Sequence, residues 1–390
     1  MGNSRNLANL LGTGSTIATA KIADDAITAA KIADDAVGGA AISDATFRAT
    51  DNLLHNGSMI VAQRAVSSTS TGVQTCDRWF VQASDFDQLA FTQHRSATAP
   101  DGFNRSLRVE VTTAETALAS NELMWIRQVL EARDCQRLAF GSSAAKSLTL
   151  SFYVRSSLTG KYSVLFYNGD NTRSNTQSFT VNTADTWEYK TITIDGDTDS
   201  GGGINDDNGF GLSVYFALAA GTDYTGTPHS GWGAYSETDD FAFSDNVNFA
   251  AQTGNFYLTG VQLQEGTVAT PFIHRSFAED LAICQRFFQK SYNYETAVGT
   301  ATTVGCIQLE SNSDITGTFL QGIRFPVNMR GTPTVVTYDT DGNSNKVSTS
   351  AGTNKPKNVQ HQSQSGMSVG EATTSTIAWF RAHYTASAEY

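Results

Sequence analysis

Charged side chains are scarce in this sequence. Asp, Glu, Lys and Arg make up 16% of the 390 residues, where an average protein has about 25%. Ser, Thr and Asn dominate the polar remainder and Gly reaches 33, a composition that favours β-structure with many turns. The formal net charge of -12 argues against nucleic acid or an anionic membrane as a partner, because phosphate binding requires a clustered basic surface.

Long apolar runs are also missing. The longest candidate, Val214 to Ala220, has the length of a strand and falls far below the roughly 18 apolar residues of a membrane span, so we expect no membrane insertion. The first eleven residues hold neither an apolar core nor a small-residue cleavage site, so Sec-type secretion is not expected. The cysteines form no CxxC pair, which predicts buried thiols made in a reducing cytoplasm rather than a zinc site or a disulfide framework; they are Cys76, Cys135, Cys284 and Cys306.

A ten-residue repeat occupies the first fifty residues, where IATAKIADDA (17–26) is followed directly by ITAAKIADDA (27–36). Five-residue spacing advances an α-helix by about 500°, so the apolar residues form no stripe on a single helix. In a strand, five is odd and alternate members face opposite sides. We therefore predict that residues 13–50 form an intertwined oligomeric stalk; a disordered low-complexity linker is the alternative. The apolar positions are Ile17, Ile22, Ile27, Ile32, Val37, Ile42 and Phe47.

Short alternating segments separated by Gly, Asn and Asp begin at residue 51. Leu148 to Val154 and Leu212 to Leu218 alternate apolar and polar residues, as half-buried strands do. The pattern predicts an all-β protein with a jelly-roll β-sandwich over 51–275. A capping box at Ser276 predicts a connecting helix over 277–290 within the segment 276–290. A smaller β-domain is expected over 291–390, with 340–366 as a long exposed loop.

Aromatic residues in polar, Gly-rich loops are the candidate ligand-binding residues, because flat rings stack on sugars while polar neighbours read the hydroxyl groups. Tyr224, His229, Trp232 and Tyr235 lie in one such loop; the alternative is that Trp232 packs back on the sandwich. Tyr167, Asn168 and Asp170 belong to an Asn-Gly hairpin turn that we expect to face solvent. Four other tryptophans lie in strand-like runs and are expected in the core, namely Trp79, Trp125, Trp187 and Trp379.

Catalytic and metal-binding patterns are weak. Glycoside hydrolysis requires two carboxyl groups across a cleft, and the acidic candidates occur only in solvated loops; they are Asp206, Asp207, Glu237, Asp239 and Asp240. Asp195, Asp197 and Asp199 alternate and offer oxygen ligands for calcium, but they lack the rest of an EF-hand; a turn of solvated side chains is the alternative. We therefore expect no catalytic residues and no resident metal or cofactor, with a structural calcium as the one candidate.

Several motifs resemble tail fibre proteins of marine and cyanobacterial tailed phages. They are RNLANLLG (5–12) with the decads, NGSMIVAQR (56–64), DRW (77–79), GVQLQEGTVATPF (260–272), EDLAICQRFF (279–288) and FPVNMRGTP (325–333). The central segment is also similar to carbohydrate-binding jelly rolls, which often carry structural calcium.

This resemblance implies a homotrimer in the virion tail, assembled in the cytoplasm of the bacterial host. Residues 1–12, with Leu7, Leu10 and Leu11, would be the anchor to another virion protein. The fibre would attach to the host by multivalent binding of a surface glycan. A non-adhesive decoration protein of the virion and a polysaccharide depolymerase tailspike are the alternatives.

Overall fold

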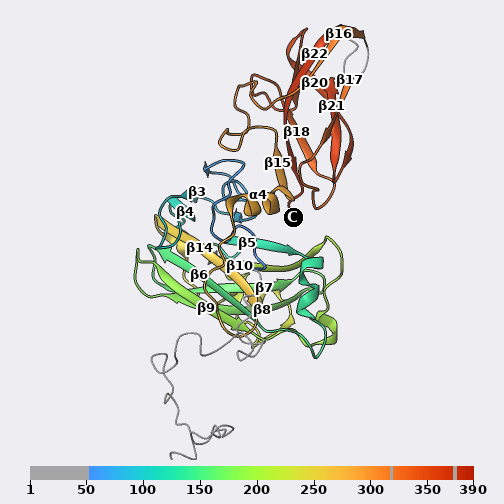
Figure 1. The fold of residues 1–390 in the computed structure, drawn as a ribbon. Helices are drawn as coiled ribbons and strands as arrows, with labels where there is room; N and C mark the ends of the chain where they lie inside the picture. Colours follow the sequence, from blue (N-terminus) through green and yellow to red (C-terminus); the bar gives the residue numbers. More distant parts are fainter. Residues whose placement is uncertain (1–51, 317–318, 372–375) are drawn as a thin grey trace, which may run out of the picture. The chain divides into compact units, whose positions relative to one another are not determined.

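The computed structural model describes residues 52–316, 319–371 and 376–390. The predicted stalk positions from Ile17 to Phe47, and the anchor residues Leu7, Leu10 and Leu11, lie outside the described residues. The described residues begin at Asn52, and Figure 1 shows how their strands and helices are arranged.

Two six-stranded antiparallel sheets face each other and form a β-sandwich. Sheet A has the order β1-β3-β4-β14-β6-β9 and sheet B the order β12-β8-β7-β10-β5-β2. The strands of sheet A are β1 (Ser67–Ser68), β3 (Ala90–Ser96), β4 (Ser106–Thr113), β14 (Gly254–Glu265), β6 (Leu148–Ser156) and β9 (Glu188–Ile194). Those of sheet B are β12 (Gly233–Ala234), β8 (Arg173–Val181), β7 (Gly160–Asn168), β10 (Phe210–Ala220), β5 (Leu123–Glu131) and β2 (Phe80–Ser84).

Alternation along the strands explains why these segments form a sandwich. In β10, Leu212, Val214 and Phe216 are fully buried, and the residues between them point to the opposite face of sheet B. Phe152 of β6 packs edge-on against Phe216 with ring centroids 5.1 Å apart, so the two inner faces interlock in one core. The predicted all-β jelly-roll sandwich is confirmed.

Short elements in the long loops surround the sandwich. They are η3 (Ala132–Leu138), η4 (Ser200–Gly202), β11 (Thr225–Gly226), α3 (Glu237–Asp240), β13 (Ala242–Phe243) and η5 (Phe249–Ala251). β11 and β13 pair in parallel and fold the segment after β10 back on itself. This segment also forms one wall of the candidate site.

Helix α4 (Phe277–Gln285) follows the sandwich. Its capping box is present as predicted, because Ser276 Oγ accepts from the Glu279 amide and the Glu279 side chain accepts from the Ser276 amide. The prediction that the helix continues to residue 290 is wrong. The chain leaves the helix after Gln285 because Phe288–Lys290 forms strand β15, which pairs with the last strand of the protein.

The C-terminal strands form a second β-structure with its own core. Its strands are β15 (Phe288–Lys290), β16 (Ile307–Thr316), β17 (Phe319–Arg324), β18 (Thr334–Tyr338), β19 (Lys346–Thr349), β20 (Gly352–Ser363), β21 (Gly366–Glu371) and β22 (Thr376–Ser387). The core includes Met329, Val347, Val369 and Phe380. The prediction of a long loop over 340–366 is wrong, because β19 and β20 pair there. β20 is largely exposed and is held by ladder hydrogen bonds rather than by an apolar face, so its composition carries no strand pattern.

The tryptophans do not all lie in the core. Trp79 is fully buried, whereas Trp125, Trp187 and Trp379 are half-buried, so the core prediction is wrong for these three. Trp125 lies on the outward face of sheet B, where the candidate site forms. No disulfide joins the cysteines, and no helix among the described residues is long and apolar enough to cross a membrane.

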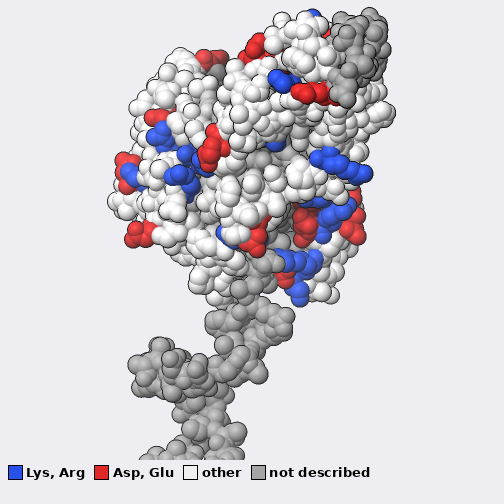
Figure 2. All heavy atoms as spheres, turned by 45° about the horizontal axis from the view of Figure 1, so that its top comes forward, with Lys and Arg blue, Asp and Glu red and all other residues white. Residues whose placement is uncertain are grey.

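Charged side chains of both signs are interspersed among mostly uncharged residues on the face drawn in Figure 2. Several of the cations are paired: Arg108 lies 2.8 Å from Glu110, and Arg137 lies 2.8 Å from Glu265. Pairs of this kind neutralise the local field, although each exposed pair adds little stability.

Candidate functional site

An aromatic cleft of about 350 Å³ lies on the face of sheet B that points away from sheet A. The register explains its position: Tyr215 of β10 stands between Arg127 of β5 and Leu165 of β7, and Ala217 stands opposite Trp125. Their side chains therefore share one face of neighbouring strands. The cleft is lined by Leu123, Trp125, Leu165, Tyr167, Phe210, Tyr215, Tyr235, Glu237 and Phe241.

The rings of the aromatic cleft hold one another edge-to-face. Trp125 and Tyr215 have centroids 5.1 Å apart at 72°, and Tyr167 and Tyr235 have centroids 5.1 Å apart at 76°. Arg127 donates to the Tyr215 hydroxyl at 2.8 Å and its guanidinium lies 5.0 Å from the Trp125 ring centroid. Contacts of this type, worth about 0.5–1.5 kcal/mol each, orient the rings before any ligand arrives.

The segment after β10 closes one side of the aromatic cleft. Buried Asp240 anchors it: the carboxylate accepts from the Ser236 amide at 2.7 Å and from the His229 amide at 3.2 Å. Thr176 of β8 donates to the Asp240 carbonyl, which ties the segment to sheet B. Burial, aided by the negative charge of Glu237, raises the pKa of Tyr235, so its hydroxyl stays protonated and able to donate.

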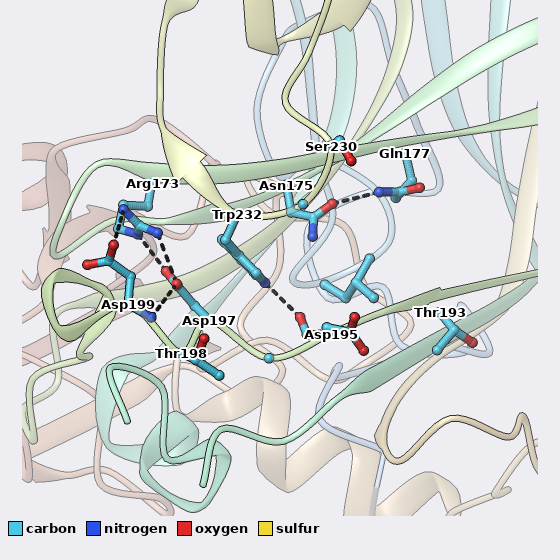
Figure 3. Close-up of a pocket in the computed structure, with 13 residues that line it drawn as sticks. Arg173, Asn175, Gln177, Thr193, Asp195, Asp197, Thr198, Asp199, Ser230 and Trp232 are labelled. Atoms are coloured by element: carbon cyan, nitrogen blue, oxygen red, sulfur yellow. Dashed lines mark hydrogen bonds and ion pairs between the residues drawn. The ribbon is translucent and has the colours of Figure 1, made fainter. Parts of the chain in front are cut away.

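A second hollow, the polar cavity, has a volume of about 540 Å³ and lies where β8 and the end of β9 meet the 230–232 segment (Figure 3). Along β8, Arg173, Asn175 and Gln177 are paired with Asn168, Phe166 and Val164. They therefore point toward the inner side of the sandwich, as Phe179 and Val181 do further along. The full lining is Arg173, Asn175, Gln177, Thr193, Ile194, Asp195, Gly196, Asp197, Thr198, Asp199, Ser230, Gly231 and Trp232.

A buried ion pair forms one end of the polar cavity. Arg173 donates to the two carboxylate oxygens of Asp197 at 2.6 and 3.0 Å, and this hydrogen bonding raises the pKa of Arg173. The carboxylate also packs against Gly202, where a Cβ would lie 2.3 Å from Asp197 Oδ2. A side chain at position 202 would therefore displace the Asp197 carboxylate.

The candidate calcium ligands Asp195, Asp197 and Asp199 are engaged separately within the protein. Asp197 is bound by Arg173, and Asp199 caps η4 by accepting from the Gly201 amide at 2.8 Å. Asp195 is exposed. Within the described ranges no group of three His, Cys, Asp or Glu side chains is placed to hold a metal ion.

The structure separates the predicted sugar-binding residues. Tyr167 and Tyr235 meet in the aromatic cleft, and Tyr224 supports its wall through Phe241, with ring centroids 6.3 Å apart. Trp232 lies in the polar cavity, where its Nε1 donates to the Asp195 carbonyl at 2.8 Å. His229 lies outside both linings, with its Nε2 3.4 Å from the buried Asp240 carboxylate.

The predicted hairpin turn is present between β7 and β8, where Asn168 pairs with Arg173, but Asn168 does not face solvent. Asn168 is fully buried at the end of β7 and donates to the Gly202 carbonyl at 2.8 Å, because its strand position points it inward. Asp170 bonds Asn205 through a side-chain contact of 2.8 Å. Neither residue lines the aromatic cleft or the polar cavity, so the prediction of a solvent-facing binding turn is wrong for Asn168.

The sequence interpretation missed Trp125, Tyr215 and Phe210. A signal was present, because Trp125 and Tyr215 occupy the outward positions between buried residues of β5 and β10. The six aromatic residues of the cleft come from β5, β7, β10 and the segment after β10. No strand supplies more than two of these rings, so no single strand carries a row of them.

Comparisons with solved structures cover about half of this chain. No protein-family model matches the sequence, and no curated protein matches it either. Among solved structures, the enzymatically active domain of tailspike protein 4 of bacteriophage CBA120 is similar at 10% identity and a TM-score of 0.31, over 55% of this chain and 21% of that one. The match thus spans about a fifth of the tailspike chain.

Carbohydrate-binding modules are similar over most of their own length. The family 22 module of Clostridium thermocellum Xyn10B matches at 12% identity and a TM-score of 0.29, over 57% of this chain and 99% of the module. A structure described as a CBM4 matches at 15% identity and a TM-score of 0.27, over 54% of this chain and 97% of that one.

Proposed function

We propose that this chain is a non-enzymatic, glycan-binding subunit of a phage tail fibre that attaches the particle to the host surface. The aromatic cleft is the observation that carries the binding claim: rings from several strands gather on one outward face around an open hollow. Small-molecule sites are typically concave, largely apolar and aromatic, with a few polar groups that fix orientation. The cleft has this composition, with Glu237 and the Tyr hydroxyls as its polar groups.

The carboxyl groups support binding without cleavage. Glycosidases place two carboxyl groups across the scissile bond, and Glu237 is the acidic residue among those lining the aromatic cleft. Asp240 is buried and occupied by amides of its own loop. Asp206 and Asp207 in a loop and Asp239 in α3 are exposed, and they belong to neither hollow.

Trp125→Ala tests the glycan-binding proposal. Removing the largest ring of the aromatic cleft is expected to weaken binding at least tenfold, since each tenfold loss corresponds to about 1.4 kcal/mol and a stacked aromatic contributes that much. The measurement is binding of the full chain to a glycan array and to host cells. Trp187→Ala is the matched control, because Trp187 packs on Tyr257 of sheet A, 5.9 Å between centroids.

Three outcomes of this experiment would overturn parts of the proposal. A blank array and unbound cells would favour a decoration protein of the virion. Release of oligosaccharides from host capsule would favour a depolymerase. Equal losses for Trp125→Ala and Trp187→Ala would show that the aromatic cleft is not the binding surface.

Trimerisation through residues 13–50 is the second part of the proposal, and the five-residue repeat supports it. Three weak sites on one fibre raise the overall avidity without any new contact. Light scattering after size exclusion is expected to give a trimer for the full chain and a monomer for a 51–390 truncation. A truncated chain that remains trimeric would refute the role of the stalk.

A further inference from the structure

The polar cavity contains a buried amide with an unused hydrogen-bond donor. Asn175 is 2% exposed, and its Oδ1 accepts from Gln177 Nε2 at 2.7 Å. Its Nδ2 has no partner among the described residues and points into the space between β8 and the Asp195 segment (Figure 3). Because this donor faces the open cavity, it can donate to an acceptor that a ligand supplies.

Asn175 occupies a strand position that faces the inside of the sandwich. Phe179 and Val181, on the same face of β8, belong to the core, whereas Arg173, Asn175 and Gln177 line the polar cavity. Apolar side chains at these positions would simply extend the core. With these three polar side chains, a cavity of about 540 Å³ stays open at the edge of the sandwich.

The other lining groups define the ligand chemistry. Asp195 lines the polar cavity, and its Oδ1 accepts from Ser147 Oγ at 3.3 Å, which leaves Oδ2 as an acceptor. Ser230 offers a hydroxyl that both donates and accepts, whereas the Thr193 hydroxyl lies 3.1 Å from that of Thr149. Trp232 forms a rigid wall, because its Nε1 is bonded to Asp195 and its ring packs edge-on against Phe140 at 5.3 Å. A ligand that satisfies these groups needs several adjacent groups that act as both donor and acceptor, as the hydroxyls of a sugar ring do.

Charge restricts the ligand further. Three lining carboxylates, from Asp195, Asp197 and Asp199, face one guanidinium, and that cation is engaged by Asp197. The polar cavity is therefore net negative and repels anions. Sugars that carry a carboxylate, sulfate or phosphate are disfavoured.

We propose that the polar cavity is a second sugar-binding site, separate from the aromatic cleft, that holds one uncharged sugar residue through its hydroxyl groups. Asn175 Nδ2 donates to a ring hydroxyl oxygen, and Asp195 accepts from a neighbouring hydroxyl. Each chain then carries two sugar sites of different chemistry on one sandwich.

The test uses the full chain carrying Trp125→Ala, which removes the aromatic cleft from the readout. Ligand-observed NMR is recorded with the methyl glycosides of glucose, galactose and mannose, and with methyl glucuronoside as the anionic probe. We expect saturable binding of at least one neutral glycoside, and at least tenfold weaker binding of the glucuronoside.

Two further substitutions assign the binding to the polar cavity. Asn175→Ala is expected to weaken neutral-glycoside binding about tenfold, the loss of one buried hydrogen bond, while Ser178→Ala, exposed on the opposite face of β8, leaves it unchanged. Asp195 is exposed, so we expect Asp195→Asn to fold normally and to reduce the preference for neutral glycosides over the glucuronoside. If Asn175→Ala fails to fold, the Asp195→Asn variant tests whether the sugar binds in the polar cavity.

The second site is overturned if no neutral glycoside binds to the Trp125→Ala chain, or if the glucuronoside binds equally well. It is also overturned if the folded Asn175→Ala and Asp195→Asn variants both behave as the parent does. These results leave the aromatic cleft untouched, because that site is tested by Trp125→Ala alone.

Discussion

Replacing Trp79 by alanine is expected to lower the free energy of unfolding by about 3–5 kcal/mol, the cost of truncating a large buried aromatic. Trp79 is fully buried between the sheets, with its ring centroid 6.5 Å from that of Phe216 on β10. Its Nε1 also donates to the Asn56 carbonyl at 3.1 Å. The substitution therefore leaves a cavity and removes one of the two hydrogen bonds that the Asn56 carbonyl accepts, the other coming from the Met59 amide at 3.0 Å.

Urea denaturation followed by circular dichroism of the 51–390 chain measures this loss. Trp79→Phe is the informative control: it keeps most of the ring volume and removes the hydrogen bond, so we expect a smaller loss of about 0.5–1.5 kcal/mol. If the free energy of unfolding of Trp79→Ala lies within about 1 kcal/mol of that of the parent, the loss falls below the range for core truncations, and Trp79 is not a central core residue.

Arg173→Ala is expected to cost about 3–5 kcal/mol, because it leaves Asp197 as an unpaired buried carboxylate. The Asp197 side chain is 2% exposed and the Arg173 side chain 14%. The pair joins β8 of sheet B to the loop that follows β9 of sheet A. Its loss therefore also deforms the polar cavity.

A double-mutant cycle measures the interaction energy between Arg173 and Asp197 apart from their contacts with other residues. Arg173→Ala with Asp197→Ala removes both charges, so the double variant is expected to be more stable than the sum of the single losses predicts. Lys161→Ala on β7 is the matched surface control: Lys161 pairs with Asp245, whose side chain is 69% exposed, and we expect a far smaller change there. Additive losses would show that Arg173 and Asp197 contribute independently.

The strands show which parts of the fold a local sequence pattern predicts and which it does not. Leu148 to Val154 and Leu212 to Leu218 alternate clearly, and both segments are strands of the sandwich. Where a strand is stabilised by pairing alone, as in β20, the same reasoning fails, because an exposed strand needs no apolar face. The helix that begins at Ser276 shows the same limit, since its start is a local capping motif and its end depends on a pairing partner about 100 residues away.

The aromatic cleft depended on sheet order. Trp125, Tyr167 and Tyr215 are neighbours only because β5, β10 and β7 lie side by side in sheet B, an order that no short window of sequence encodes. The polar cavity depended on a different long-range contact, between β8 and the residues that follow β9. Asp197 looked like a calcium ligand for this reason: its true partner, Arg173, is 24 positions away.

The sequence by itself determined the all-β class, the start of the helix and the five-residue repeat, because each is a pattern of nearby residues. Scarce charge likewise fits the mostly uncharged surface on the face drawn in Figure 2. Only the tertiary structure decided which aromatic rings meet, which carboxylates are paired and where a buried amide lacks a partner. Those properties arise when strands distant in the chain are placed side by side, so they follow from packing rather than from local pattern.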